Sequence, residues 1–374
     1  MSIASLQKAT HSITLVIFSL QHNPSKLGFC LLLNENVVLF LTSRNVVHCF
    51  STAKQQNKKK IQRIFSKKYT NFKRFEYSLS FLLSIIPFFL LSLWRFFIKQ
   101  KRMDAKRILY ITQEITPYLP ESEVSKICRN LPQGIQEKGR EIRTFVPRYG
   151  NINERRNQLH EVIRLSGMNL IIDDTDHPLI IKVASIQSAR MQIYFIDNED
   201  FFHRKATVAD DEGKEYEDND ERAIFYVRGV LETVKKLRWI PDLVHCHGWL
   251  SALAPIYLKR MYADDPSFAG TKVVYSVYAD SFKKSLNKAL PGKMKQDGMT
   301  DKDLQLMKTS TDFATLSSLA IQYSDGVIQG SRKISKKVSE FIESTNKPFL
   351  PYHDGSTYID AYNEFYDEIL NTKK

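Results

Sequence analysis

The chain has 374 residues, of which 54 are Lys or Arg and 41 are Asp or Glu, giving a net charge of +13. This length suits two domains, or one domain with an appendage. Residues 1–102 hold 16 basic residues and only two acids, Glu35 and Glu76, which leaves 38 basic and 39 acidic residues, a net charge of −1, for residues 103–374. A basic chain suggests a nucleic-acid partner. Here the excess lies in one Lys-rich tract without a recognisable binding module, so we exclude nucleic acid.

Residues 1–102 differ in composition from the rest of the chain. They are rich in Phe, Leu, Ser, Asn, Lys and Ile, and they show neither a steady helical nor a steady strand period. We interpret them as a non-globular extension, and we favour an upstream stretch translated in error ahead of Met103. The alternative is a membrane-anchor-like segment at Leu79–Ile98, which is long enough to span a bilayer but is interrupted by Pro87 and Arg95.

The cysteines are sparse and show no paired spacing. There are four of them, without a C-x-x-C motif: Cys30, Cys49, Cys128 and Cys246. This usage suits a reducing compartment, so we expect a cytoplasmic protein. The triplet His245–Cys246–His247 is the one pattern that suggests a metal, but no further ligand cluster accompanies it. We therefore expect neither a metal nor a cofactor.

Short apolar runs alternate with amphipathic stretches through residues 103–374, which predicts one α/β domain with a Rossmann-like parallel sheet and helices on both faces. The predicted strands are Arg107–Thr112, Ile142–Pro147, Leu179–Ser185, Met191–Asp197, Asp242–His245, Lys272–Tyr278 and Gly326–Gln329. The predicted helices are Ser122–Lys138, Asp220–Leu237, Trp249–Arg260, Phe313–Gln322 and Lys333–Phe341. Two stretches are predicted to be irregular and exposed, Ala206–Asp218 and Asn287–Asp303.

A further helix is expected at the end of the chain. Around Tyr358–Leu370, aromatic and aliphatic residues recur at helical spacing: Tyr358, Tyr362, Phe365, Tyr366 and Ile369. Such a stripe predicts a helix that packs its apolar face on the sheet.

Three ordered sequence blocks resemble the glycogen and starch synthase family, over about 240 residues. From Arg107 the chain reads RILYITQEITPYLPESEVSKICRNLPQGIQEKGREIRTFVPRYG, similar to the family's S-E-x-x-P, L-P-x-x-L and P-R-Y segments. From Tyr194 it reads YFIDNEDFFHRKATVADDEGKEYEDNDERAIFY, similar to Tyr-x-x-Asp-Asn, Phe-x-Arg and Tyr-x-Asp-Asn-x-x-Arg. From Pro241 it reads PDLVHCHGWLSALAPIYLK, similar to P-D-x-V-H-x-H-D-W.

The resemblance implies the N-terminal half of a GT-B glycosyltransferase, in which two Rossmann-like domains face each other across a cleft. The implied activity is that of a retaining ADP-glucose:α-1,4-glucan glucosyltransferase, with a glucan or another oligosaccharide as acceptor and ADP-glucose as donor. The family's donor-binding Arg, Lys and Glu have no counterparts in the printed sequence. We therefore expect no independent transferase activity, and a protein partner that supplies the donor domain is one interpretation.

The resemblance also points to pocket residues. Glu114 matches the S-E glutamate at the end of the first strand, where open α/β sheets bind ligands; its alternative is a solvated loop acid. Asp218, Asn219 and Arg222 match Asp-Asn-x-x-Arg, whose Asp lines the family's active site, although acids at a helix start also stabilise the helix dipole.

The third block adds two aromatic candidates. His247 matches a histidine that contacts a sugar hydroxyl or phosphate, with a buried structural histidine as the alternative. Trp249 is expected to pack the start of its helix rather than to stack on a sugar.

The chain departs from the family on the phosphate side. Where the family has Lys-x-Gly-Gly, it has Pro120, Glu121, Ser122 and Glu123. Glycines let backbone N–H groups approach phosphates and the Lys pairs with them, so two carboxylates here predict a helix cap instead of a phosphate cradle. Gly248 stands for the family's Asp, and Tyr278–Ala279 for its His-Asn.

Three functions remain open: a transferase completed by another chain, a non-catalytic protein that recognises an oligosaccharide or a partner, and a site for a different small ligand. The altered phosphate loop favours the second, because it removes transition-state stabilisation, whereas the resemblance favours the first.

Overall fold

The computed structural model describes residues 105–374, apart from 205, 280–281, 356 and 373–374, together with four strands before residue 51. The chain divides into two compact units, Met1–Phe96 and Phe97–Lys374. In the first unit, β1 to β4 form an antiparallel sheet in sequence order: Ile13–Ser19, Leu27–Leu33, Val37–Leu41 and Val46–Phe50. Leu79–Ile98 lies outside the described residues. No helix among the described residues is long and apolar enough to cross a membrane.

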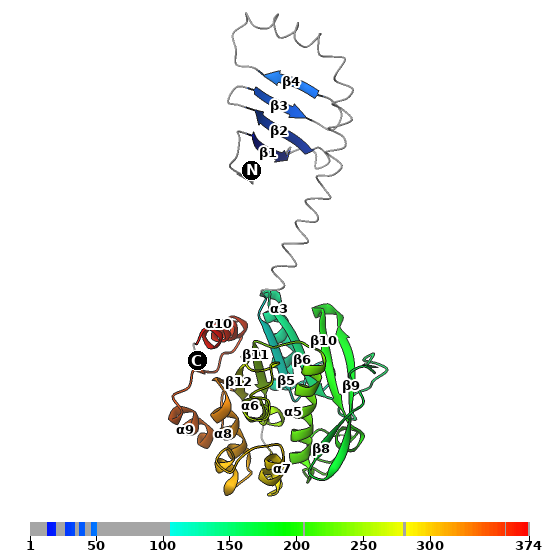
Figure 1. Ribbon diagram of the computed structural model, residues 1–374, viewed down its shortest axis with the longest axis vertical. Helices are drawn as coiled ribbons and strands as arrows, with labels where there is room; N and C mark the ends of the chain where they lie inside the picture. Colours follow the sequence, from blue (N-terminus) through cyan, green and yellow to red (C-terminus); the bar gives the residue numbers. More distant parts are fainter. Residues whose placement is uncertain are drawn as a thin grey trace, which may run out of the picture. The chain divides into compact units, whose positions relative to one another are not determined.

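The second unit is an α/β domain built on one mixed sheet (Figure 1). Its strand order is β14-β13-β12-β11-β5-β6-β10-β9-β7, and β8 pairs with β9. The strands from β14 to β10 run parallel, whereas β9 is antiparallel to β10, β7 and β8. The strands are β5 Arg107–Thr112, β6 Glu141–Pro147, β7 His160–Glu161, β8 Met168–Ile172, β9 Thr175–Ile186, β10 Met191–Asp197, β11 Leu243–His247, β12 Lys272–Val277, β13 Gly326–Gln329 and β14 Phe349–Leu350.

The predicted α/β class with a Rossmann-like, mainly parallel sheet is confirmed, and the β9 edge of that sheet is antiparallel. The reason lies in the connections. Helical segments link β5 to β6, β10 to β11 and the strands from β11 to β14 in chain order. In contrast, β9 and β10 are linked only by the short 3₁₀ turn η3 (Gln187–Ala189), which is too short for a parallel crossover.

Helices cover both faces of the sheet. The α-helices are α3 Glu123–Glu137, α4 Glu199–Phe202, α5 Asn219–Lys236, α6 Ala254–Lys259, α7 Leu290–Gln296, α8 Phe313–Tyr323, α9 Lys336–Ser344 and α10 Tyr358–Asn371. Two further 3₁₀ turns are η4 Trp249–Ser251 and η5 Gln305–Lys308. Side chains of α5, α6 and α8 belong to the large core. Leu131 and Ile135 of α3 share a smaller core with α10.

The predicted docking of the last helix is confirmed. Tyr362, Phe365, Tyr366 and Ile369 of α10 are buried against Ile108 and Tyr110 of β5, Val274 of β12 and Ile328 of β13. A hydrogen-bonded chain anchors this contact, because the Tyr366 hydroxyl lies 2.6 Å from His245 Nδ1 and 3.4 Å from the Tyr110 hydroxyl. The helix is therefore an integral part of the domain core.

The prediction that Asn287–Asp303 is irregular and exposed was wrong. Helix α7 forms within it, and Leu290, Met294 and Asp303 are buried. Lys293, although charged, is also buried, because it pairs with Asp220 at 2.8 Å at the start of α5. A buried ion pair between segments far apart in sequence holds this region against the domain. The stretch Ala206–Asp218 does lack helix and strand, as expected, apart from one isolated bridge between Ala209 and Glu215.

Candidate functional site

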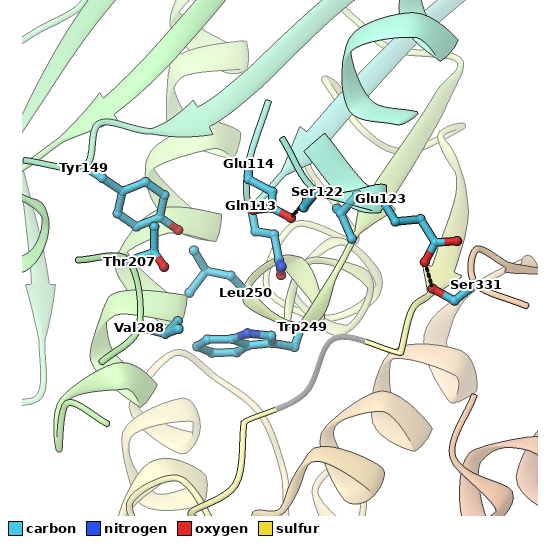
Figure 2. A pocket seen from close by; sticks show the side chains of 11 residues that line it. Gln113, Glu114, Ser122, Glu123, Tyr149, Thr207, Val208, Trp249, Leu250 and Ser331 are labelled. Atoms are coloured by element: carbon cyan, nitrogen blue, oxygen red, sulfur yellow. Dashed lines mark hydrogen bonds between the residues drawn. The ribbon is translucent and has the colours of Figure 1, made fainter. Parts of the chain in front are cut away.

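The candidate pocket lies beyond the carboxyl ends of β5, β11 and β13, the edge of a parallel sheet where ligands bind. It encloses about 260 Å³. Glu114 and Trp249 line it, as do two members of the altered phosphate loop, Ser122 and Glu123 (Figure 2). The other residues that line it are Gln113, Val124, Tyr149, Thr207, Val208, Leu250 and Ser331. The lining therefore contains two carboxylates and, among the described residues, no Lys or Arg.

The start of α3 shapes one wall of the pocket. Ser122 is the helix N-cap: its hydroxyl accepts from the backbone N–H of Ser125 at 2.9 Å, and the Ser125 hydroxyl accepts from the Ser122 N–H at 2.8 Å. The Ser122 hydroxyl also donates to Glu114 at 2.6 Å (Figure 2). A carboxylate of the chain itself thus lies beside the helix N-terminus, the position that favours an anion.

The expectation that Glu121 and Glu123 cap this helix was wrong. Ser122 provides the cap, because a hydroxyl at that position reaches the N3 amide directly. Glu121 turns to the surface and pairs with Lys126 at 2.8 Å. Glu123 accepts a hydrogen bond from the Ser331 hydroxyl at 2.5 Å, across the pocket rim (Figure 2). Pro120 and Glu121 are absent from the lining.

The start of α5 supports the opposite wall without lining the pocket. The fully buried Arg222 donates from Nε to the backbone oxygen of Phe201 at 2.8 Å and from Nη1 to Asn219 Oδ1 at 2.7 Å. Its guanidinium lies 5.4 Å from the Phe202 ring centre, a cation–π contact. Asn219 Nδ2 donates to the backbone oxygen of Val208 at 2.9 Å. These contacts hold the loop that carries Thr207 and Val208 into the pocket.

Asp218 has a similar supporting position. It forms a two-pronged ion pair with Arg204, and one of the two hydrogen bonds measures 2.6 Å. Arg204 in turn lies over the Tyr216 ring at 4.6 Å. Because Arg204 belongs to the loop before Thr207, the pair fixes both ends of that loop.

His247 lies in the layer behind the pocket. It is fully buried, and its Nδ1 lies 2.7 Å from the hydroxyl of Tyr278, which is itself buried. Burial lowers the pKa of His247 to about 3, so the ring is neutral. Its ring centre lies 3.8 Å from that of His245, whose pKa burial also lowers. Among the described residues, no group of three or more potential ligands could hold a metal ion.

Trp249 packs into the core at the start of its helical segment and also lines the pocket. Its side chain is 2% exposed and meets the Phe282 ring edge-on at 5.0 Å, so it packs the start of its helical segment. One side of the indole nevertheless forms the floor of the pocket (Figure 2).

Two kinds of lining residue were not predicted from the sequence. Gln113 and Ser331 follow β5 and β13, so the rule that ligands bind at carboxyl strand ends could have found them. Thr207 and Val208 lie in a loop without periodicity, which is held in place by contacts such as the Asn219–Val208 hydrogen bond and the Arg204–Asp218 ion pair.

A second hollow, of about 580 Å³, lies between the β8–β9 turn, α5 and α7. Its charged side chains pair with each other or with neighbouring acids. Arg228 pairs with Asp297 at 2.9 Å and Lys293 with Asp220 at 2.8 Å. These pairs join α5 to α7, and Gln296 of α7 donates to Asp173 of the β8–β9 turn at 3.1 Å, which is a structural role.

Comparison with known proteins identifies the family. The profile of the starch synthase catalytic domain matches residues 107–345, well over half of the chain. The chain belongs to the starch synthase catalytic domain family. A glycogen synthase of Chlorobium limicola is 37% identical over 173 residues, which cover 46% of this chain and 35% of that protein. A glycogen synthase of Chlorobaculum parvum is 30% identical over 240 residues, covering 64% and 48%.

A solved structure supports the fold. The catalytic domain of starch synthase IV from Arabidopsis thaliana, bound to ADP and acarbose, aligns with a TM-score of 0.56 at 16% identity, covering 67% of this chain and 52% of that chain. The α/β domain is thus similar in fold to part of a starch synthase catalytic domain. The chain spans between about a third and a half of the length of the curated relatives it matches.

Proposed function

We propose that this domain binds the end of a glucan or related oligosaccharide in the pocket beyond β5, β11 and β13, and that the pocket disfavours sugar-nucleotide phosphates. The observation that carries this proposal is the Glu114–Ser122 hydrogen bond at the N-terminus of α3. It fills an anion-binding position with a carboxylate of the chain itself. A phosphate there would meet Glu114 and Glu123 at short range, and like charges repel most strongly where water is partly excluded.

The chemistry of the lining suits a neutral polyol. Carboxylates, an amide and hydroxyls supply acceptors and donors for sugar hydroxyls, and Trp249 with Leu250 supplies an apolar floor. The volume of about 260 Å³ is below the range of about 300–1,000 Å³ that is typical for drug-sized ligands. It therefore suits one sugar ring better than a whole sugar nucleotide.

A second candidate function is transfer of glucose from ADP-glucose to a glucan. Two observations favour it: the family match, and the relative whose solved structure holds ADP and acarbose. In that case the donor phosphates bind away from the start of α3, and a donor domain on the same or another chain contacts them.

Calorimetric titration of the full chain separates the two candidates. We expect maltotriose to bind and ADP-glucose to show no measurable heat. Glu114→Gln should weaken maltotriose binding by about tenfold, because it removes a charge-assisted acceptor. The matched control is Glu121→Gln, seven residues along the chain and on the surface, which should leave the affinity unchanged.

Two results would contradict the proposal. One is ADP-glucose affinity equal to that of maltotriose. The other is an equal response of maltotriose binding to the Glu114 and Glu121 substitutions. Transfer of labelled glucose from ADP-glucose to maltotriose by the pure protein would support the second candidate directly.

A further inference from the structure

Two glycines behind the pocket mark places where a side chain from another strand fills the space beside the backbone. At Gly330, an added Cβ would lie 2.4 Å from the Tyr278 ring. At Gly248, whose φ is +79°, it would lie 2.1 Å from the Gln113 side-chain oxygen. Neither neighbour leaves room for a methyl group, so the Tyr278 ring lies directly on Gly330 and the Gln113 side chain directly on Gly248.

Neither Tyr278 nor His247 is among the residues that line the pocket. Gln113 and Ser331 line the pocket, Ser331 follows Gly330, and Gly248 follows His247. The Ser331 hydroxyl ties this layer together, because it accepts from the Ala279 N–H at 3.1 Å and donates to Glu123 at 2.5 Å. The start of α3 is thereby bonded to the residue after Tyr278.

Tyr278 also provides a hydrogen-bond partner for His247. Its hydroxyl lies 2.7 Å from His247 Nδ1. His247 Nε2 is buried and has no hydrogen-bond partner among the described residues. Among the described residues, the imidazole is therefore held by one hydrogen bond, from the residue that follows β12.

We propose that Tyr278 is a specificity-determining residue of the pocket: its ring, lying on Gly330, keeps His247 out of reach of a bound sugar. This inference rests on the proposed function and deepens it. The pocket ends at Gln113 and Ser331, and it admits a single neutral sugar unit that is held by the carboxylates of Glu114 and Glu123. Residue 278 sets how deep the pocket extends, and therefore which groups of the sugar the protein can contact.

The first test measures the accessibility of His247 and needs no ligand. The full chain is treated with diethyl pyrocarbonate, and modification of each histidine is followed by mass spectrometry. His160, which is exposed, should react quickly, and His247 and His245 should be protected. In Tyr278→Ala, His247 should react at least about tenfold faster than in the wild type, because protected groups react only through local opening. Tyr278→Phe is the matched control, because it keeps the ring on Gly330 and should keep the protection.

Gly330→Ala provides an independent route to the same opening, since its Cβ displaces the ring while Tyr278 remains. His245 reports on general unfolding, because it lies under α10 and should stay protected in each variant. Rapid modification of His247 in the wild type would overturn the proposal. Unchanged protection of His247 in both Tyr278→Ala and Gly330→Ala would overturn it as well.

The second test measures maltotriose affinity in a double-mutant cycle of Tyr278 and His247. In the wild-type background, His247→Ala should change the affinity by less than about twofold, because the ring does not touch the ligand. In the Tyr278→Ala background, the same substitution should weaken binding by about fivefold, the value of one new hydrogen bond. Equal effects in the two backgrounds would refute the specificity role. If maltotriose does not bind the wild type at all, the proposed function fails, whereas the accessibility test still decides whether Tyr278 shields His247.

Discussion

Replacing Tyr366 by Phe tests how the last helix is held to the domain. The Tyr366 hydroxyl is fully buried and lies 2.6 Å from His245 Nδ1, and it lies 3.4 Å from the Tyr110 hydroxyl. The substitution removes one oxygen and leaves the ring in place, so the main loss is a partner for a buried imidazole nitrogen. An unsatisfied buried polar group costs about 1–3 kcal/mol, and we expect unfolding free energy to fall by that amount.

Urea-induced unfolding of the full chain, followed by circular dichroism, measures this change. The matched control is Tyr358→Phe, in the first turn of the same helix and only partly buried, which should change the free energy by less than about 0.5 kcal/mol. Because the effect is on native contacts, the denaturant slope should stay constant while the midpoint shifts. Equal shifts for Tyr366→Phe and Tyr358→Phe would refute the role of the hydrogen-bonded chain.

Three more predictions address other parts of the domain. Ser122→Ala should destabilise the chain by about 1 kcal/mol in urea unfolding, because it removes the cap of α3, whereas Ser335→Ala should have little effect, because Ser335 makes no side-chain cap at α9. Burial acts to raise the pKa of Asp303, but hydrogen bonds from Thr300, Arg260 and Tyr323 outweigh it and hold the pKa below its ordinary value. The stability that Asp303 contributes should therefore be present above about pH 4 and be lost as the pH falls further, and Asp303→Asn should flatten the acid limb of stability against pH. Finally, residues 103–374 expressed alone should unfold cooperatively at the same temperature as the full chain, and loss of a cooperative transition would contradict the predicted domain boundary.

The elements that could be predicted from the sequence are those whose buried residues form a recognisable pattern within one short stretch of the chain. β5, β10 and β13 lie within one residue of their predicted bounds, because each is a short apolar run buried on both faces. The aromatic stripe of α10 was equally readable, because five residues at helical spacing define one face.

The parts that could not be predicted depend on partners distant in sequence. The Asn287–Asp303 segment contains Pro, Gly and several Lys, which suggest a loop, and the pairing of Lys293 with Asp220 and Glu221 makes burial of a charge tolerable there. The position of His247 was ambiguous for another reason. A strand end places a side chain near the ligand edge but does not say whether that side chain is buried, and here His247 is fully buried with its Nδ1 2.7 Å from the Tyr278 hydroxyl.

The altered phosphate loop explains why restoring glycines alone would not create a phosphate site. Replacing Glu121, Ser122 and Glu123 by Gly removes one lining carboxylate, but it also removes the N-cap of α3 and the donor that orients Glu114. The Glu114 carboxylate belongs to the end of β5 and would remain beside the helix N-terminus, where the positive end of the dipole favours it. Nucleotide affinity should therefore stay unmeasurable in that variant and increase only when Glu114→Gln is added. Calorimetric titration with ADP measures the affinity of the triple-glycine variant with and without Glu114→Gln. Tight ADP binding by the triple-glycine variant alone would show that Glu114 does not occupy the anion position.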